Sequence, residues 1–94
     1  MLILTLAILA ILAASPPEAP TRAELAKAIT KMTSKRVTAT SIRGISCKPI
    51  GEELSEFACR WQQRSTARWR SYSSFLTVDS SGWILIDLPG PVTK

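Results

Sequence analysis

The residues with the most chemical promise are arginines interleaved with aromatic side chains in a short segment. This segment contains Arg60, Trp61, Arg64, Arg68, Trp69, Arg70 and Tyr72. Guanidinium groups match the geometry of phosphate, sulfate and carboxylate, and aromatic faces stack on sugars or bases. On neighbouring strands, the four arginines could share one outward face. We therefore predict a ligand-binding surface made of Arg60, Arg64, Arg68, Trp69, Arg70 and Tyr72.

A simpler interpretation of the same segment stays open. Trp61 alternates with polar neighbours and is expected in the core, and the arginines are then ordinary solvated strand positions. Trp69 has an arginine on each side, so the pattern does not decide between core and surface. An exposed Trp69 would favour a binding role.

Catalysis would depend on carboxylates, because the sequence contains no histidine. Ser-His-Asp and Cys-His catalysis and all histidine-containing metal sites are thereby excluded. Paired carboxylates can hydrolyse glycosides, but a domain this small has little room for a substrate cleft. We predict no catalytic, metal-binding or cofactor-binding residues, with a small carboxylate hydrolase as the alternative. The acidic candidates would be Glu52, Glu53, Glu56, Asp79 and Asp87.

Cys47 and Cys59 are the only cysteines. Placing them opposite each other on adjacent strands aligns Ile45 with Trp61 and points all four side chains to one face. A disulfide closing about a dozen residues contributes roughly 3 kcal/mol, a large part of the stability of a small domain. Two thiols without histidine make no plausible zinc site, and the spacing differs from C-x-x-C redox motifs. We predict a structural disulfide.

Residues 21–34 have the pattern of an amphipathic helix. Thr21 and Glu24 form the capping-box sequence that begins many helices. The apolar residues that follow recur at helical spacing: Leu25, Ala28, Ile29 and Met32. Lysines at i+4 spacing mark one flank, either as a solvated face or as a basic stripe for an anionic surface: Lys27, Lys31 and Lys35.

From Arg36 onward the apolar period changes to two, which predicts strands. We expect one strand from Val37 to Cys47 with a bulge at Gly44, then a loop over 48–55. Further strands are expected near 57–64, 67–78 and 83–88. In the last hairpin Val78 should face Trp83, Leu76 should face Leu85 and Phe75 should face Ile86. Pro89-Gly90-Pro91 should end the sheet.

These elements predict an α+β fold. One N-terminal amphipathic helix packs on a three- to four-stranded antiparallel β-meander that carries one disulfide. We expect residues 21–94 to form a single small domain, preceded by the proline-rich spacer 15–20.

The beginning of the sequence predicts export. Residues 2–14 read LILTLAILAILAA, which suits a signal peptide and falls short of the roughly 20 residues that span a bilayer. We expect a signal peptide over 1–14 with cleavage after Ala14. A retained anchor is the alternative, because no Lys or Arg precedes the apolar run. The expected location is periplasmic or secreted, and the Ala- and Arg-leaning composition gives the impression of a bacterial protein.

The charge balance favours acidic partners. Twelve Lys and Arg residues against seven Asp and Glu residues give a net charge of +5. For an exported chain the partner would be an anionic glycan, a lipid head group or an acidic protein, rather than nucleic acid. We predict a non-enzymatic binding domain for an anionic envelope ligand. The alternative is a protein-interaction or inhibitor-like domain in which the arginines are incidental. The sequence does not determine the oligomeric state.

Overall fold

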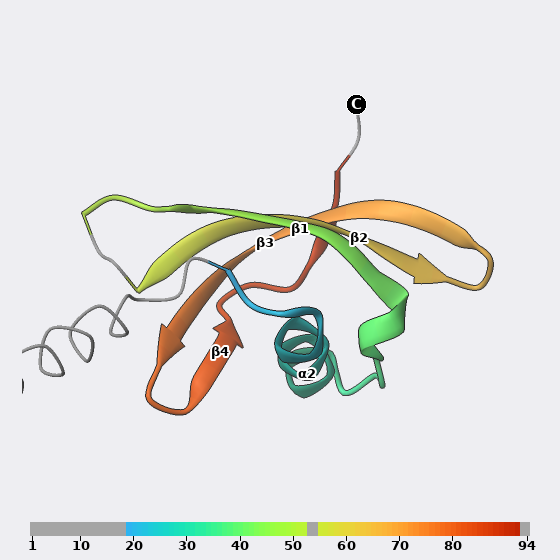
Figure 1. Cartoon of the computed structure of the whole chain (residues 1–94), viewed down its shortest axis with the longest axis horizontal. Helices are drawn as coiled ribbons and strands as arrows, with labels where there is room; N and C mark the ends of the chain where they lie inside the picture. The colour runs from blue at the N-terminus through green and yellow to red at the C-terminus, as the bar shows by residue number, and fades with distance from the viewer. Residues whose placement is uncertain (1–18, 53–54, 93–94) are drawn as a thin grey trace, which may run out of the picture.

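A computed structural model of the chain describes residues 19–52 and 55–92. The predicted signal peptide, its cleavage site and the first part of the spacer lie outside the described residues. One helix packs on an antiparallel sheet, as Figure 1 shows. In chain order the elements are α2 (Arg22–Thr33), the 3-10 turn η1 (Ala39–Ser41), β1 (Ile42–Pro49), β2 (Glu56–Ser65), β3 (Arg68–Asp79), β4 (Gly82–Leu85) and β5 (Gly90–Pro91).

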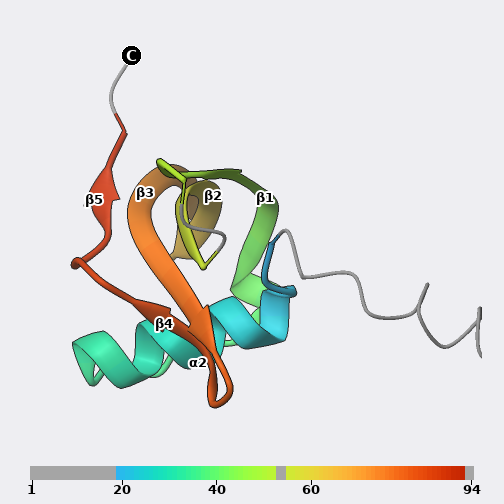
Figure 2. The same cartoon turned by 90° about the vertical axis from the view of Figure 1, so that its left-hand side faces the viewer.

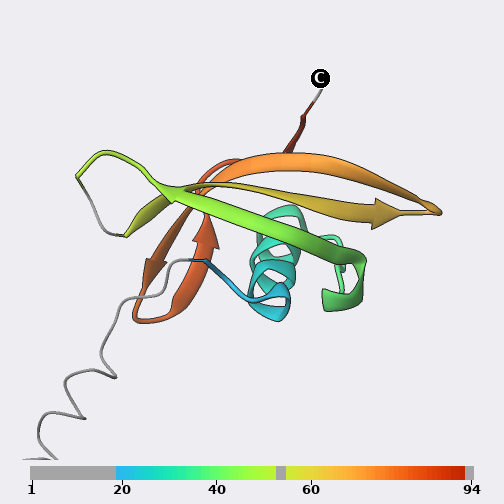
Figure 3. The ribbon, with the colours of Figure 1, turned by 45° about the horizontal axis from the view of Figure 1, so that its top comes forward.

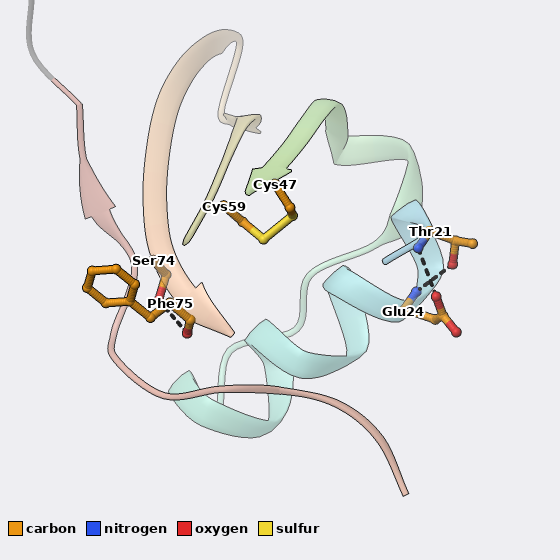
Figure 4. Close-up of a disulfide and its surroundings, with 6 residues drawn as sticks. All are labelled: Thr21, Glu24, Cys47, Cys59, Ser74 and Phe75. Atoms are coloured by element: carbon orange, nitrogen blue, oxygen red, sulfur yellow. Dashed lines mark hydrogen bonds between the residues drawn. A yellow bond between two sulfur atoms is a disulfide. The ribbon is translucent and has the colours of Figure 1, made fainter. Parts of the chain in front are cut away.

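Helix α2 begins at the predicted capping box. The Glu24 amide donates to the Thr21 hydroxyl at 3.1 Å, and the Thr21 amide donates to the Glu24 carboxylate at 2.8 Å (Figure 4). The helix ends at Ser34, whose backbone adopts the left-handed conformation. Lys35 therefore lies beyond the helix. Of the three lysines predicted on one helix flank, Lys35 is placed wrongly. Met32 is also more exposed than the apolar pattern predicts.

The sheet has the strand order β1-β2-β3-β4, which confirms the predicted antiparallel meander, but a short fifth strand, β5, exceeds the predicted three or four. The hairpin register is also confirmed, with Val78 opposite Trp83 and Leu76 opposite Leu85. The Ile86 amide donates to the Phe75 carbonyl at 2.8 Å, as expected from the same alignment. Figure 3 shows β1 along the near edge of the sheet, where it crosses in front of α2.

The C-terminal segment corrects two predictions. Strand β4 ends at Leu85 rather than at Leu88: the chain bends at Ile86 and Asp87, and the Asp87 carbonyl accepts from the Ser74 hydroxyl at 2.7 Å. The Pro89-Gly90-Pro91 segment does not end the sheet, since β5 pairs with β3 at Tyr72 and Ser73. Figure 2 shows this segment rising away from α2.

The first strand begins later than the alternation predicts. The Val37 amide donates to the Thr30 hydroxyl at 2.9 Å, which ties this residue to the helix instead of to a strand. The Ser41 amide and hydroxyl both donate to the Thr38 carbonyl, at 3.1 and 2.7 Å, and close the 3-10 turn. Hydroxyl side chains thus give residues 37–41 local hydrogen bonds that compete with strand pairing.

The predicted bulge at Gly44 is confirmed. Gly44 has a φ of +64°, and the register between β1 and β2 shifts between Arg43 and Ser46. Arg43 pairs with Gln62 and Ser46 pairs with Arg60, so Gly44 and Ile45 together stand opposite Trp61. Ile45 therefore stands opposite Trp61 as expected, but Gly44 occupies the same position in the pairing.

The hydrophobic core lies between α2 and the sheet face that points toward it, which we call the inner face. The helix contributes Leu25, Ala26, Ala28 and Ile29, and the strands contribute Ile42, Phe57, Cys59, Trp61, Leu76, Trp83 and Leu85. Trp61 is 1% exposed, so its predicted place in the core is confirmed. The Cys47–Cys59 disulfide joins directly opposed residues of β1 and β2 on this face, with Cα atoms 4.1 Å apart (Figure 4).

Candidate functional site

The register of the β2–β3 hairpin divides the predicted ligand-binding residues between the two faces of the sheet. Arg64 stands opposite Trp69, and both lie on the face away from α2, which we call the outer face. Arg60 lies on the outer face as well. Arg68, Arg70 and Tyr72 pair with Ser65, Gln63 and Trp61 and lie on the inner face. The prediction that the four arginines share one face is wrong.

The short turn between the two strands explains this division. Because Ser65 pairs with Arg68, every residue of β2 faces a partner of opposite numerical parity on β3. Outer positions are therefore even-numbered on β2 and odd-numbered on β3, since side chains alternate along a strand. Arg60 and Arg64 fulfil this condition, whereas Arg68 and Arg70 do not.

Trp69 is the centre of a cation–aromatic cluster on the outer face. The Cζ atom of Arg43 lies 4.0 Å from the centroid of the indole ring, and that of Arg64 lies 5.2 Å from it. The Arg43 Nε group also donates to Gln62 Oε1 at 2.7 Å. Trp69 is half-buried and does not belong to the core. The Trp69 indole on β3 thus makes cation–π contacts with an arginine from β1 and an arginine from β2.

Arg43 was not among the predicted site residues, although the sequence contained a signal for it. Uninterrupted alternation places Arg43 on the same face as Ile45 and Cys47. The bulge at Gly44 inserts an additional residue, so Arg43 points to the opposite face from Cys47. Glycine in a strand is a sign of such a bulge. Because a bulge reverses the face of the residues before it, the outward position of Arg43 could have been predicted from Gly44.

Basic side chains continue along the outer face beyond this cluster. Lys48 pairs with Ala58, and Ser46 pairs with Arg60, in two successive outward rows. The cationic side chains of the outer face are all exposed, namely Arg43, Lys48, Arg60 and Arg64. We call the set Arg43, Lys48, Arg60, Arg64 and Trp69 the basic outer surface. Glu56 and Asp87 are exposed acidic residues near the same part of the sheet, so positive charge is in excess there.

A groove of about 460 Å³ adjoins the basic outer surface. Its floor is made by small outward side chains of three strands, and its walls are longer side chains and the segment after β4. The residues that shape it are Ser46, Lys48, Ala58, Arg60, Ser73, Phe75 and Leu88. Figure 4 shows the Phe75 ring pointing away from the disulfide.

The remaining predicted site residues lie on the inner side of the sheet, where only Tyr72 lines a second groove. Arg68 and Arg70 are exposed near the end of the β2–β3 hairpin. Tyr72 packs against the core and lines a groove of about 450 Å³ together with Ile29, Val37 and Pro89. The two arginines therefore belong to a different surface from Arg60 and Arg64.

Among the carboxylates of the hydrolase alternative, Asp79 has a structural role in a turn. Glu53 lies outside the described residues. Asp79 belongs to the β3–β4 turn, where its Oδ1 atom accepts from the amide and hydroxyl of Ser81 at 2.8 and 2.6 Å. These hydrogen bonds lower the pKa of Asp79 below its ordinary value. Within residues 19–52 and 55–92, no three acidic or cysteine side chains are grouped to hold a metal ion.

No protein-family model, curated protein or solved structure matches this chain. In the described part of the chain, no helix has the length and hydropathy needed to cross a membrane. The functional argument therefore depends on the side chains that the sheet brings together.

Proposed function

We propose that this protein is a non-enzymatic binding domain that recognises an anionic ligand through its basic outer surface. The observation that carries the proposal is the cluster in which the guanidinium groups of Arg43 and Arg64 lie 4.0 and 5.2 Å from the Trp69 ring. Exposed arginines held against an aromatic ring are already positioned for a ligand, so less side-chain entropy is lost on binding.

The chemistry of the cluster suits an anion with a second, flat or apolar part. Guanidinium groups donate several hydrogen bonds to phosphate, sulfate or carboxylate in a fixed geometry. Arg43 uses its Nε group on Gln62, and its terminal nitrogens remain available for such an anion. Arg60 and Lys48 extend the positive surface along the strands. An anionic glycan, a lipid head group or an acidic protein would share this recognition.

The proposed location follows from the apolar leader. Export to the periplasm or to the medium would bring the domain to envelope polymers and lipids rather than to nucleic acid. Nucleic acid is therefore not part of the proposal, although its phosphates could bind the same arginines in a purified system.

The test compares two variants that lose the same charge from different faces. R43Q/R60Q/R64Q removes three arginines from the outer face, and R36Q/R68Q/R70Q removes three exposed arginines from elsewhere. Binding to heparin and to phosphatidylglycerol vesicles would be measured at low and at physiological salt. We expect the outer-face variant to bind roughly tenfold more weakly or worse, and the control to change less than about threefold. Equal losses would reject the basic outer surface as the site.

A protein-interaction domain is the second candidate, and the edge position of β1 supports it. Among the described residues β1 pairs with β2 alone, so its other side is open to an added strand. A partner that co-purifies in stoichiometric amount with both the wild type and R43Q/R60Q/R64Q would favour this candidate over an anionic ligand.

A further inference from the structure

We infer that the ligand is an anionic amphiphile, with its alkyl chain in the outer groove and its charged head group on Arg60 and Lys48. This inference depends on the proposed function and specifies its ligand class. It arises from the groove of about 460 Å³ next to the basic outer surface, a volume within the range of small-molecule sites.

The groove exists because small side chains occupy three of the six positions in two outward rows. One row crosses the sheet as Lys48, Ala58 and Phe75, and the next as Ser46, Arg60 and Ser73. Successive rows on one face are about 7 Å apart. Ser46, Ala58 and Ser73 fill little of that space, while the segment after β4 adds a wall beside β3 through Leu88.

Apolar surface is exposed at the β3 side of this groove. Phe75 is 45% exposed and Leu88 is 66% exposed, and both line the groove with Ala58. Ligand pockets are lined mainly by apolar and aromatic side chains with a few polar groups, and this groove combines both kinds. The aliphatic stems of Lys48 and Arg60 can cover a further part of an alkyl chain while their charges remain in water.

Positive and negative side chains lie at opposite sides of the same groove, and this arrangement sets the orientation of a bound anionic ligand. Lys48 and Arg60 are on β1 and β2, whereas Asp87 lies in the segment beside β3. An anionic head group is attracted to the first two strands and repelled by the Asp87 carboxylate. The alkyl chain then points toward Phe75 and Leu88. A polymeric glycan would leave this apolar side unused.

The test uses a series of alkyl phosphates as monomers, from butyl to octyl phosphate, with octyl glucoside as the uncharged probe. We expect roughly a fourfold gain in affinity for each buried methylene, measured by calorimetry. R60Q should weaken octyl phosphate about fivefold or more. L88S should weaken octyl phosphate about fivefold and leave butyl phosphate unchanged. I86S is the matched control for L88S, because Ile86 is also exposed but does not line the groove.

The outcomes separate this inference from the proposed function. Salt-sensitive binding that is independent of chain length would overturn the amphiphile and leave the proposal of an anionic ligand on the basic outer surface intact. Equal binding of octyl glucoside and octyl phosphate, or equal losses in L88S and I86S, would also overturn it. Displacement of bound phosphate by polyglutamate without any chain-length effect would assign the site to an acidic peptide. If no alkyl phosphate binds and R43Q/R60Q/R64Q leaves heparin binding unchanged, both proposals fail.

Discussion

Arg43 and Trp69 are in cation–aromatic contact across an intervening strand. The Cζ atom of Arg43 on β1 lies 4.0 Å from the indole centroid of Trp69 on β3, although β2 separates these strands in the sheet. Gln62 on β2 accepts a hydrogen bond of 2.7 Å from Arg43 between them. The contact therefore joins three strands on the outer face and holds a positive group over an accessible aromatic ring.

This contact predicts the quenching behaviour of the tryptophan fluorescence. Trp61 and Trp83 are 1% and 8% exposed, so Trp69 is the ring that a quencher in solution reaches best. Neighbouring positive charge concentrates iodide at Trp69 and excludes caesium. In R43Q/R64Q we expect the iodide quenching constant to fall roughly twofold, with no fall for neutral acrylamide. R68Q, on the inner face, is the control. Equal quenching by iodide and caesium in the wild type would contradict the prediction.

The Cys47–Cys59 disulfide should be a major source of stability. It closes a sequence separation of 12 residues. The C47A/C59A variant should lose about 3 kcal/mol of unfolding free energy, because the unfolded chain regains the entropy of the open loop. Urea unfolding with and without a reducing agent measures this loss. Reductant should lower the midpoint of the wild type and leave that of the alanine variant unchanged; a wild-type midpoint insensitive to reductant would refute the assignment.

The capping box should contribute measurably to the stability of α2. The Thr21 hydroxyl accepts the Glu24 amide at 3.1 Å, and Thr21→Ala leaves this amide without its side-chain partner. We expect a loss of about 1 kcal/mol in unfolding free energy, measured by urea titration. Thr21→Ser keeps the hydroxyl and should remain close to the wild type. A serine variant as unstable as the alanine variant would show that the hydroxyl does not act as a cap.

Asp79 should give the β3–β4 turn a small pH dependence. Hydrogen bonds from Ser81 lower the pKa of Asp79 below the ordinary value of 3.8. The ionised form is thus favoured in the folded state, and its contribution is present above the unfolded pKa and lost as pH falls through the folded one. The difference in unfolding free energy between the wild type and D79N should therefore shrink on acidification. S81A should show a smaller pH dependence than the wild type. A difference that grows toward low pH would contradict this sign.

Local signals in the sequence were sufficient for most of the fold. The capping box predicted the start of α2, and alternation predicted the strands β2, β3 and β4 with the register of Val78 and Trp83. These features depend on neighbours in sequence or on one hairpin, so local pattern is enough to predict them. The start of β1 was predicted too early, because the Thr30 hydroxyl binds Val37 and no periodicity shows such a contact.

The capping box, the alternation of apolar residues, the two cysteines and the bulge glycine can be recognised in the sequence by itself. They were sufficient to predict the helix, the disulfide and the antiparallel order of the strands. Tertiary structure decided which arginines share a face with Trp69. A bulge or a turn that changes the pairing by one residue moves a side chain to the other face. Gly44 brought Arg43 to Trp69, and the turn after Ser65 placed Arg68 and Arg70 on the opposite face.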